Sequence, residues 1–335
     1  MPRLSYSGRA VVLVAMSAIP ALPLCAQWSA PSGDTLRRIL TDRTERGGSV
    51  GVVMGVIERG VPRIVAVGRQ AGEGPSPLDG NTIFEIGSVS KVFTTTLLAE
   101  MVSRGEVSLD DPVQKYLPKV VTIPSRNGRA ITLLDLATAS SGLPRLRDDF
   151  TLADLDNPYA DYAVEHMYSF LSGHALRREP GAEYVYSNLG MGLLGPALAL
   201  RAGMSYAQLV TERILKPLGM TDTRIVLTSD MRSRLATGHT ADMTPTRNWD
   251  IPTLAGAGAW RSSVNDLLRF LAANLSPPEG SLGKAIALAV APRRPAGSPS
   301  LRIGLGWHVL ERSGRSLVWH NGQTGGYHSF AGFDP

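Results

Sequence analysis

Cysteine is almost absent from this chain of 335 residues, and lysine is scarce. The single cysteine is Cys25, close to the N-terminus, so the rest of the chain has neither a disulfide framework nor thiol chemistry. Arginine carries most of the positive charge, since only five of the 34 basic residues are lysine. These basic residues form no run longer than a doublet, whereas a nucleic-acid footprint needs a clustered stripe. We therefore expect no nucleic-acid partner.

Several familiar site signatures are also missing. The six histidines include no H-E-x-x-H pattern and no cysteine cluster exists, so no metal site is expected. Residues 256–259 read Gly-Ala-Gly-Ala, without the third glycine and acidic partner of a dinucleotide site. Residues 47–51 match G-x-S-x-G, but they lead from a predicted helix into a predicted strand, and a nucleophile elbow needs the opposite order. No cofactor is implied.

The N-terminal segment has the pattern of an export signal. Two arginines precede an apolar stretch over residues 10–24, and Ala26 supplies a small residue for cleavage. We predict a signal peptide over residues 1–26 and an exported protein, periplasmic or secreted. The apolar stretch is short and contains two prolines, which disfavours a stable membrane span. Cys25 is a candidate for a lipid anchor, although the bulky residue before it argues against one.

The order of strand and helix patterns predicts a mixed α/β fold. Asp34 is placed to cap a first helix, and β-rich stretches at 50–57 and 63–68 predict a hairpin. Helical patterning then dominates as far as about residue 274, and strand patterns return between 306 and 333. We predict one domain over residues 27–335, consisting of an antiparallel sheet flanked by helices (about 34–86 and 300–335) and an inserted all-helical lobe (about 88–275). We expect residues 292–300 to form a Pro/Gly-rich loop, and a ligand site to lie in the cleft between the lobes.

The segment with the clearest chemistry is residues 84–91, Phe-Glu-Ile-Gly-Ser-Val-Ser-Lys, where a strand ends and an apolar helix begins. Side chains three apart share a helix face, so the hydroxyl of Ser88 and the amine of Lys91 can touch. A serine is a weak nucleophile until an adjacent base takes its proton. A helix N-terminus also points N–H groups at charge that develops there. This pattern predicts an acyl-transfer site.

The same spacing recurs at Ser281 and Lys284, where we interpret the serine as a helix cap. Two further motifs distinguish the first pair from the second. In residues 186–188, Tyr-Ser-Asn, Tyr186 can relay a proton and the Asn188 amide can orient Lys91 or a substrate amide. The alternative is a buried tyrosine beside a capping asparagine.

The second motif is His320-Asn321-Gly322, which ends a predicted strand. Gly322 lets a substrate approach the strand edge, and the backbone N–H of Gln323 is free to bind an oxyanion. A lone strand histidine is more often structural, so the role of His320 stays open.

Taken together, these motifs resemble the serine hydrolases of the class C β-lactamase family, which includes D-alanyl-D-alanine peptidases and esterases. Residues 84–91 fit that family's active-site segment in full, and the likeness extends from about residue 34 to the end. The other similar stretches are residues 104–106, 109–112, 131–137 and 141–144.

The resemblance implies a role for each motif residue. Ser88 resembles the nucleophile, Lys91 its lysine partner and Tyr186 the proton-transfer tyrosine. Asn188 resembles the motif's amide, and the N–H groups of Ser88 and Gln323 resemble the oxyanion hole. Which of Lys91 and Tyr186 is the acylation base stays open, but Lys91 should be partly desolvated, which disfavours its charged form.

The implied reaction is hydrolysis of a small-molecule substrate through an acyl-enzyme, with the β-lactam amide as the first hypothesis. The alternatives are a D-alanyl-D-alanine carboxypeptidase or esterase and, less favoured, a non-catalytic penicillin- or peptidoglycan-binding sensor. The oligomeric state stays open.

Two departures from the family pattern matter. The β-lactamases usually have lysine, threonine and glycine where this chain has residues 320–322. Since histidine titrates near ~6.5, we expect the site to hold a substrate carboxylate less well at pH 8 than at pH 6. The family also continues beyond residue 335 with another strand and a C-terminal helix. We therefore expect a truncated chain of poor solubility and low activity.

Overall fold

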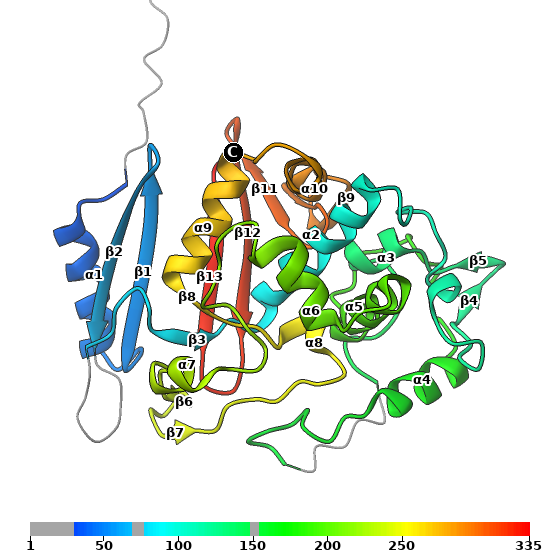
Figure 1. The fold of residues 1–335 in the computed structure, drawn as a ribbon, viewed down its shortest axis with the longest axis horizontal. Helices are drawn as coiled ribbons and strands as arrows, with labels where there is room; N and C mark the ends of the chain where they lie inside the picture. Colours follow the sequence, from blue (N-terminus) through cyan, green and yellow to red (C-terminus); the bar gives the residue numbers. More distant parts are fainter. Residues whose placement is uncertain (1–29, 69–76, 148–153) are drawn as a thin grey trace, which may run out of the picture. The chain divides into compact units, whose positions relative to one another are not determined.

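The computed structural model describes residues 30–68, 77–147 and 154–335 (Figure 1). The longer strands lie near the two ends of the described chain and most helices lie between them. This arrangement confirms the mixed α/β fold. The predicted signal peptide over residues 1–26, with Cys25, lies outside the described residues. None of the helices in the described ranges is both long enough and apolar enough to cross a bilayer.

The C-terminal strands form a five-stranded antiparallel sheet in the order β13-β12-β11-β10-β9. The sheet consists of β9 (Arg294–Ser298), β10 (Leu301–Ile303), β11 (His308–Arg312), β12 (Arg315–Gln323) and β13 (His328–Phe333). Three of these strands occupy the stretches that the sequence predicts. The predicted loop over residues 292–300 is wrong, because β9 forms there and pairs with β10.

The N-terminal strands β1 (Gly51–Glu58) and β2 (Val61–Gly68) form the predicted antiparallel hairpin. Helix α1 (Gly33–Glu45) covers one face of it, where Leu36 and Leu40 pack against Val65. The cap of this helix is Ser32 rather than Asp34, since the Ser32 hydroxyl accepts a hydrogen bond of 3.2 Å from the Thr35 amide.

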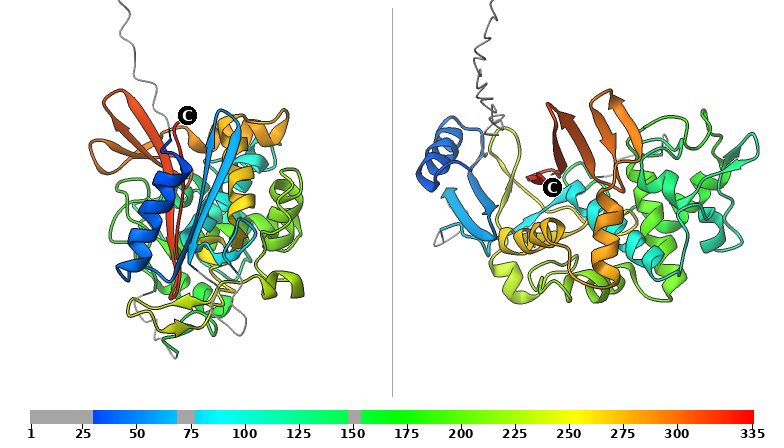
Figure 2. Two further views of the ribbon diagram at one scale, coloured as in Figure 1. Left: turned by 90° about the vertical axis from the view of Figure 1, so that its left-hand side faces the viewer. Right: turned by 90° about the horizontal axis from the view of Figure 1, so that it is seen from above.

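Helix α9 (Val264–Leu275) joins the hairpin to the C-terminal strands. A Cβ at Gly55 of β1 would lie 2.7 Å from Val264, so the absent side chain lets α9 approach the hairpin face opposite α1 (Figure 2). From the same helix Phe270 stacks on Trp307 with ring centroids 6.1 Å apart, and Trp307 meets Phe333 edge-on. Aromatic packing of this kind holds the sheet against α9.

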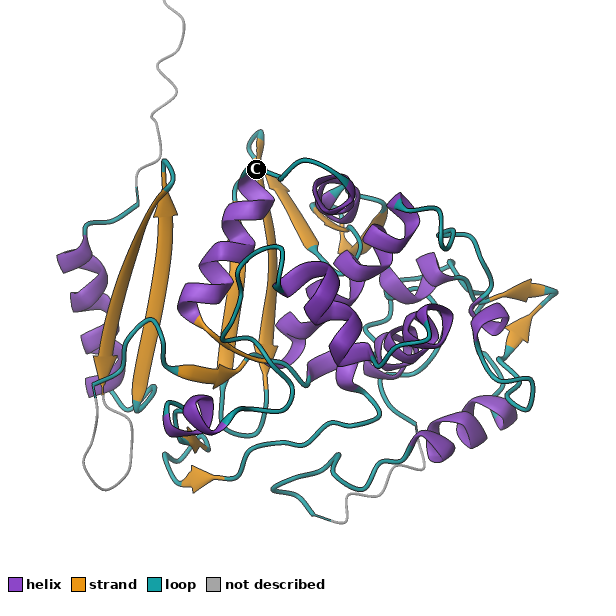
Figure 3. Ribbon diagram, in the orientation of Figure 1, coloured by secondary structure: helices purple, strands orange, loops and turns teal. Residues whose placement is uncertain are grey.

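Most of the remaining helices lie on one side of the five-stranded sheet (Figure 3). Helix α2 (Ser90–Ser103) is buried along nearly its whole length and packs against α10 (Ser281–Val290), α5 (Asn188–Ala202) and α8 (Ala255–Gly258). Its Phe93 ring lies 4.6 Å from Phe270, centroid to centroid. A helix enclosed on all sides gives a rigid support to the residues at its N-terminus.

The other elements are short. They are β3 (Ile83–Glu85), η1 (Gly87–Val89), η2 (Val113–Tyr116), β4 (Ser125–Arg126), β5 (Arg129–Ala130), α3 (Leu133–Ala137), α4 (Val164–Gly173), α6 (Tyr206–Val210), η3 (Thr211–Leu215), α7 (Ser229–Ser233), β6 (Gly238–His239), β7 (Pro245–Thr246) and β8 (Arg261–Ser263).

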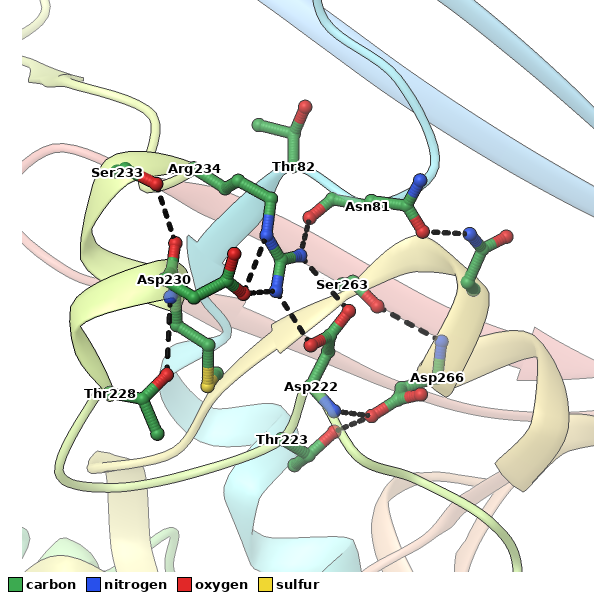
Figure 4. Close-up of polar contacts among 12 residues, drawn as sticks. Asn81, Thr82, Asp222, Thr223, Thr228, Asp230, Ser233, Arg234, Ser263 and Asp266 are labelled. Atoms are coloured by element: carbon green, nitrogen blue, oxygen red, sulfur yellow. Dashed lines mark hydrogen bonds and ion pairs between the residues drawn. The ribbon is translucent and has the colours of Figure 1, made fainter.

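A polar cluster fixes the paired strands β3 and β8 that lead to the site (Figure 4). The Arg234 guanidinium donates to the carboxylates of Asp222 at 2.8 Å and Asp230 at 2.6 Å. It also donates to the backbone carbonyl of Asn81, just before β3, at 2.6 Å. Asp266, in the first turn of α9, is fully buried and accepts from the Asp222 amide at 2.7 Å. Charge-assisted hydrogen bonds of this kind order the start of the segment that carries Ser88.

Candidate active site

Ser88 lies on a 3₁₀ turn, η1, between strand β3 and helix α2. The turn begins at Gly87, whose φ of +47° strongly favours glycine. A Cβ at Gly87 would also lie 2.7 Å from the backbone nitrogen of Gln323, so glycine permits the close approach of β12. The helix therefore begins two residues after the position that the sequence predicts, and the end of β12 lies against the turn.

Gly322 supports the same approach. A Cβ there would lie 2.0 Å from the Ile86 carbonyl oxygen, which also accepts a hydrogen bond of 2.7 Å from the Ser329 hydroxyl. From the sequence, Gly322 is predicted to let a substrate approach the strand edge. In the structure its missing side chain makes room for the backbone at Ile86, which brings Gln323 beside the Ser88 turn.

Two side chains, Lys91 from the motif of Ser88 itself and Tyr186 from the second motif, meet at the Ser88 hydroxyl. Lys91 Nζ lies 2.9 Å from Ser88 Oγ, and the Tyr186 hydroxyl donates to the same oxygen at 2.6 Å. Tyr186 is held close to α5 because Ser187 caps that helix, accepting from the Gly190 amide at 2.8 Å. The structure thus brings together Ser88, Lys91 and Tyr186, over 98 residues of sequence.

Lys91 is enclosed by the protein. Its side chain is only 2% exposed, and its amine donates to the Ala257 carbonyl at 2.6 Å. Burial lowers the pKa of Lys91 well below its usual value, and the positive charge of Arg145 lowers it further. A neutral amine beside Ser88 Oγ can accept a proton.

The pKa of Tyr186 shifts in the opposite direction. Burial raises it, while the hydrogen bond to Ser88 and the charge of Arg145 moderate the rise. Lys91 Nζ lies 4.8 Å and the Arg145 guanidinium carbon 5.1 Å from the centre of the Tyr186 ring. The site therefore contains a lysine that favours its neutral form and a phenol that keeps its proton, an acid–base pair set by environment.

Asn188, the first residue of α5, faces the same cavity. Its side-chain oxygen is buried and has no hydrogen-bond partner among the described residues. From the sequence, Asn188 is predicted to orient either Lys91 or a substrate amide. The hydrogen bonds of Lys91 go to Ser88 and to the Ala257 carbonyl, so the Asn188 amide remains for a substrate in the cavity. The cavity is lined by Gly87, Ser88, Tyr159, Asn188, Trp249 and Gln323, among others.

His320 lies in β12 and is 2% exposed. Its Nδ1 is 2.6 Å from the Asn321 carbonyl oxygen, and its ring centroid is 6.4 Å from that of Tyr186. Burial, together with the charge of Lys91 and the neighbouring His308, lowers the pKa of His320 well below its usual value. This direction argues against the expectation that His320 gains charge between pH 8 and pH 6, since its surroundings favour the neutral ring.

Several residues of the site belong to no motif that predicts a functional site from the sequence. Ala257 belongs to residues 256–259, which are too poor a match for a dinucleotide site; their small side chains let the chain approach α2, where the Ala257 carbonyl meets Lys91. Tyr159 and Trp249 line the cavity and meet edge-on, with centroids 5.4 Å apart. Both come from helix-poor segments, where hydrophobic periodicity gives no signal.

Comparison with known proteins agrees with this geometry. The family model described as Beta-lactamase matches residues 36–335. The chain belongs to the Beta-lactamase family. Two relatives from Escherichia coli (strain K12) are each 30% identical to it. One, the D-alanyl-D-alanine-carboxypeptidase/endopeptidase AmpH, aligns over 277 residues, 76% of this chain and 68% of the relative. The other, a beta-lactamase, aligns over 295 residues, 86% of this chain and 74% of the relative.

A solved structure of a class C beta lactamase superposes with a TM-score of 0.77, covering 90% of this chain and 88% of the other at 22% identity. The likeness confirms the fold that the sequence predicts. The membership of the Beta-lactamase family, together with the relatives at 30% identity, identifies the chain as a serine hydrolase.

Proposed function

We propose that the chain hydrolyses the amide bond of β-lactams through an acyl-enzyme on Ser88. The observation that supports this most directly is the position of Ser88 Oγ, within hydrogen-bond distance of both Lys91 Nζ and the Tyr186 hydroxyl. A nucleophile needs an adjacent base, and a lysine acts as one when its surroundings disfavour its charged form. Burial supplies that condition for Lys91.

In the proposed reaction, Ser88 Oγ attacks the carbonyl carbon of the lactam and its proton passes to the buried base. The backbone N–H groups of Ser88 and Gln323 stabilise the negative charge on the carbonyl oxygen. The carbon–nitrogen bond then breaks, the ring nitrogen takes a proton, and the acyl group stays on Ser88. Attack by water releases the acid and restores the serine.

The opposite pKa shifts suggest how the protons are divided. The lowered pKa of Lys91 suits it to take the serine proton. The raised pKa of Tyr186 suits it to deliver a proton to the leaving nitrogen. In this scheme Asn188, with its unpartnered oxygen, receives an N–H group of the substrate.

A D-alanyl-D-alanine peptidase is the second candidate, and the neutral His320 favours it. The expected lysine of a β-lactamase is absent there, and one of the relatives at 30% identity is a D-alanyl-D-alanine-carboxypeptidase/endopeptidase. Both candidates share the acylation step. They differ in how fast water removes the acyl group from Ser88.

The location also belongs to the proposal. The charged and then apolar pattern of residues 1–26 supports export, which would place the enzyme where β-lactams and cell-wall peptides are found. An exported enzyme that opens β-lactams rapidly would contribute to antibiotic resistance.

Mass spectrometry during reaction with a chromogenic cephalosporin tests the proposal, with Ser88→Ala as the matched control. Rapid colour with only a transient adduct supports a β-lactamase. A long-lived adduct on Ser88 with little turnover supports the peptidase. If wild type forms no adduct and turns over no cephalosporin, the acyl-enzyme proposal is wrong for this substrate class.

A further inference from the structure

Arg145 places an exposed cation beside the reacting groups. Its guanidinium carbon lies 5.1 Å from the centre of the Tyr186 ring, and the Tyr186 hydroxyl bonds to Ser88. The charge of Arg145 also acts on Tyr159, whose pKa burial raises and Arg145 lowers. Tyr159 and Ser88 both line the cavity, so the guanidinium lies close to groups that line the cavity or contact its lining residues.

The backbone of Arg145 is fixed while its side chain is exposed. Its carbonyl accepts hydrogen bonds from the amides of Asn188 at 3.0 Å and Leu189 at 3.1 Å, at the start of α5. The Ser187 hydroxyl donates to the preceding carbonyl, that of Pro144, at 2.6 Å. The segment that carries the cation is therefore attached to the motif that carries Tyr186.

No carboxylate in the described part of the chain forms an ion pair with Arg145, although several other arginines form such pairs. Arg234, Arg261 and Arg213, for example, each contact a carboxylate. The groups that shift the pKa of Lys91 include Arg145 but no acid. The Arg145 guanidinium thus has N–H donors that can bind an external anion.

We propose that Arg145 binds the carboxylate of the substrate. The proposal rests on the proposed function and names its substrate class: acyl compounds that bear a carboxylate. Arginine stays charged at every working pH and can grip a carboxylate with two parallel hydrogen bonds, so the contact discriminates anionic from neutral substrates.

Binding measured in the Ser88→Ala background separates recognition from chemistry. The probes are benzylpenicillin, which carries a carboxylate, and its methyl ester, which does not, titrated by calorimetry. Arg145→Gln should weaken benzylpenicillin binding by about tenfold, the loss of one charge-assisted contact, and should leave ester binding unchanged. Arg145→Lys should recover part of the loss, and high salt should weaken only the parent's binding of the acid.

Arg177→Gln is the matched control, because Arg177 is exposed and contributes to none of the shifts at Lys91, Tyr159 or Tyr186. It removes the same charge and should not change binding. Equal loss for acid and ester, no loss for either, or failure of the parent to bind benzylpenicillin would each overturn the role of Arg145.

A separate assay uses wild type and p-nitrophenyl acetate, a neutral ester. This substrate has no carboxylate for Arg145 to bind, so the assay tests the proposed chemistry independently of Arg145. A Ser88 acetyl adduct combined with binding that ignores Arg145 overturns this inference and leaves the acyl-enzyme intact. Absence of any Ser88 adduct overturns the chemistry, while Arg145-dependent binding in the Ser88→Ala protein still supports carboxylate recognition.

Discussion

The chain contains two serine–lysine pairs of identical spacing, and their surroundings differ in every respect that matters for chemistry. Lys91 is buried, and its amine is placed between the Ala257 carbonyl and Ser88 Oγ. Lys284 is exposed on α10, and the hydroxyl of Ser281 donates to the Glu100 carboxylate at 3.3 Å. Ser281 does not cap its helix as predicted, because it is the first helical residue and Gly280 takes the cap position.

This difference shows what spacing alone supplies. Three-residue spacing places a hydroxyl and an amine on one helix face, but a solvated amine keeps its proton at neutral pH. At Ser88 the enclosing helices remove water from the amine, and a third group, Tyr186, arrives from another segment. The pair becomes reactive only where the fold encloses it.

The largest expected effect is at the two serines. Ser88→Ala should lower kcat for a chromogenic cephalosporin by at least about 10⁴-fold, because no other group can form the acyl-enzyme. Ser281→Ala, at the matched position of the other pair, should keep the wild-type kcat. Steady-state rates of both variants measure the contrast. Similar losses in the two would show that the spacing, rather than the surroundings, matters.

The two lysines should differ next most. Lys91→Met should lower kcat by about 10²- to 10⁴-fold through loss of the base, while Lys284→Met should leave it unchanged.

The variants Lys91→Met and Lys284→Met should also differ in how the free energy of unfolding depends on pH. The unfolded chain binds a proton on Lys91 up to its ordinary pKa near ~10.4, whereas the folded chain releases it at lower pH. Stability from this group therefore rises with pH between the two pKa values and is lost as pH falls toward the folded one. The slope of unfolding free energy against pH, measured by urea denaturation, should be shallower in Lys91→Met by up to about 1.4 kcal/mol per pH unit. Lys284→Met should keep the wild-type slope; an unchanged slope in both variants would mean that Lys91 stays protonated.

Removing the Tyr186 hydroxyl should have a smaller effect on kcat. Tyr186→Phe keeps the ring and should lower kcat by about 10²-fold, since only the hydroxyl that bonds to Ser88 is lost. Tyr184→Phe is the control, because the Tyr184 hydroxyl contacts His308 Nε2 at 3.0 Å instead. Burial raises the pKa of Tyr184 to about 12, so it too stays protonated. A Tyr186→Phe enzyme as active as Tyr184→Phe would leave Lys91 as the sole proton carrier.

The smallest expected effect is at His320. Because its pKa lies well below the usual value, the ring should stay neutral from pH 8 to pH 6. Binding of benzylpenicillin to the Ser88→Ala protein should therefore be flat across that range. Binding that strengthens at pH 6, and loses this dependence in His320→Gln, would show that the histidine takes up a proton and attracts the carboxylate.

Much of the fold followed from local pattern. The hairpin of β1 and β2 and the strands β11 to β13 could be located because these segments are rich in strand-forming residues and are bounded by clear turns. Strand β9 was missed, since its proline and glycine read as a loop and only pairing with β10 makes it a strand. The division into a sheet lobe and a helical lobe stays a prediction.

The sequence by itself determined which groups this chain can use: Ser88 and Lys91 three residues apart, and a Tyr-x-Asn motif at residues 186–188. The residue types and their short spacings indicate the chemistry. Only the tertiary structure decided that backbones meet at Gly87 and Gly322, that Lys91 is buried while Lys284 is exposed, and that Arg145 lies beside Tyr186 with no carboxylate paired to it among the described residues. The protonation of these groups depends on burial and on charges from distant segments. Both act on a pKa through space, so they cannot be read from the spacing of residues along the chain.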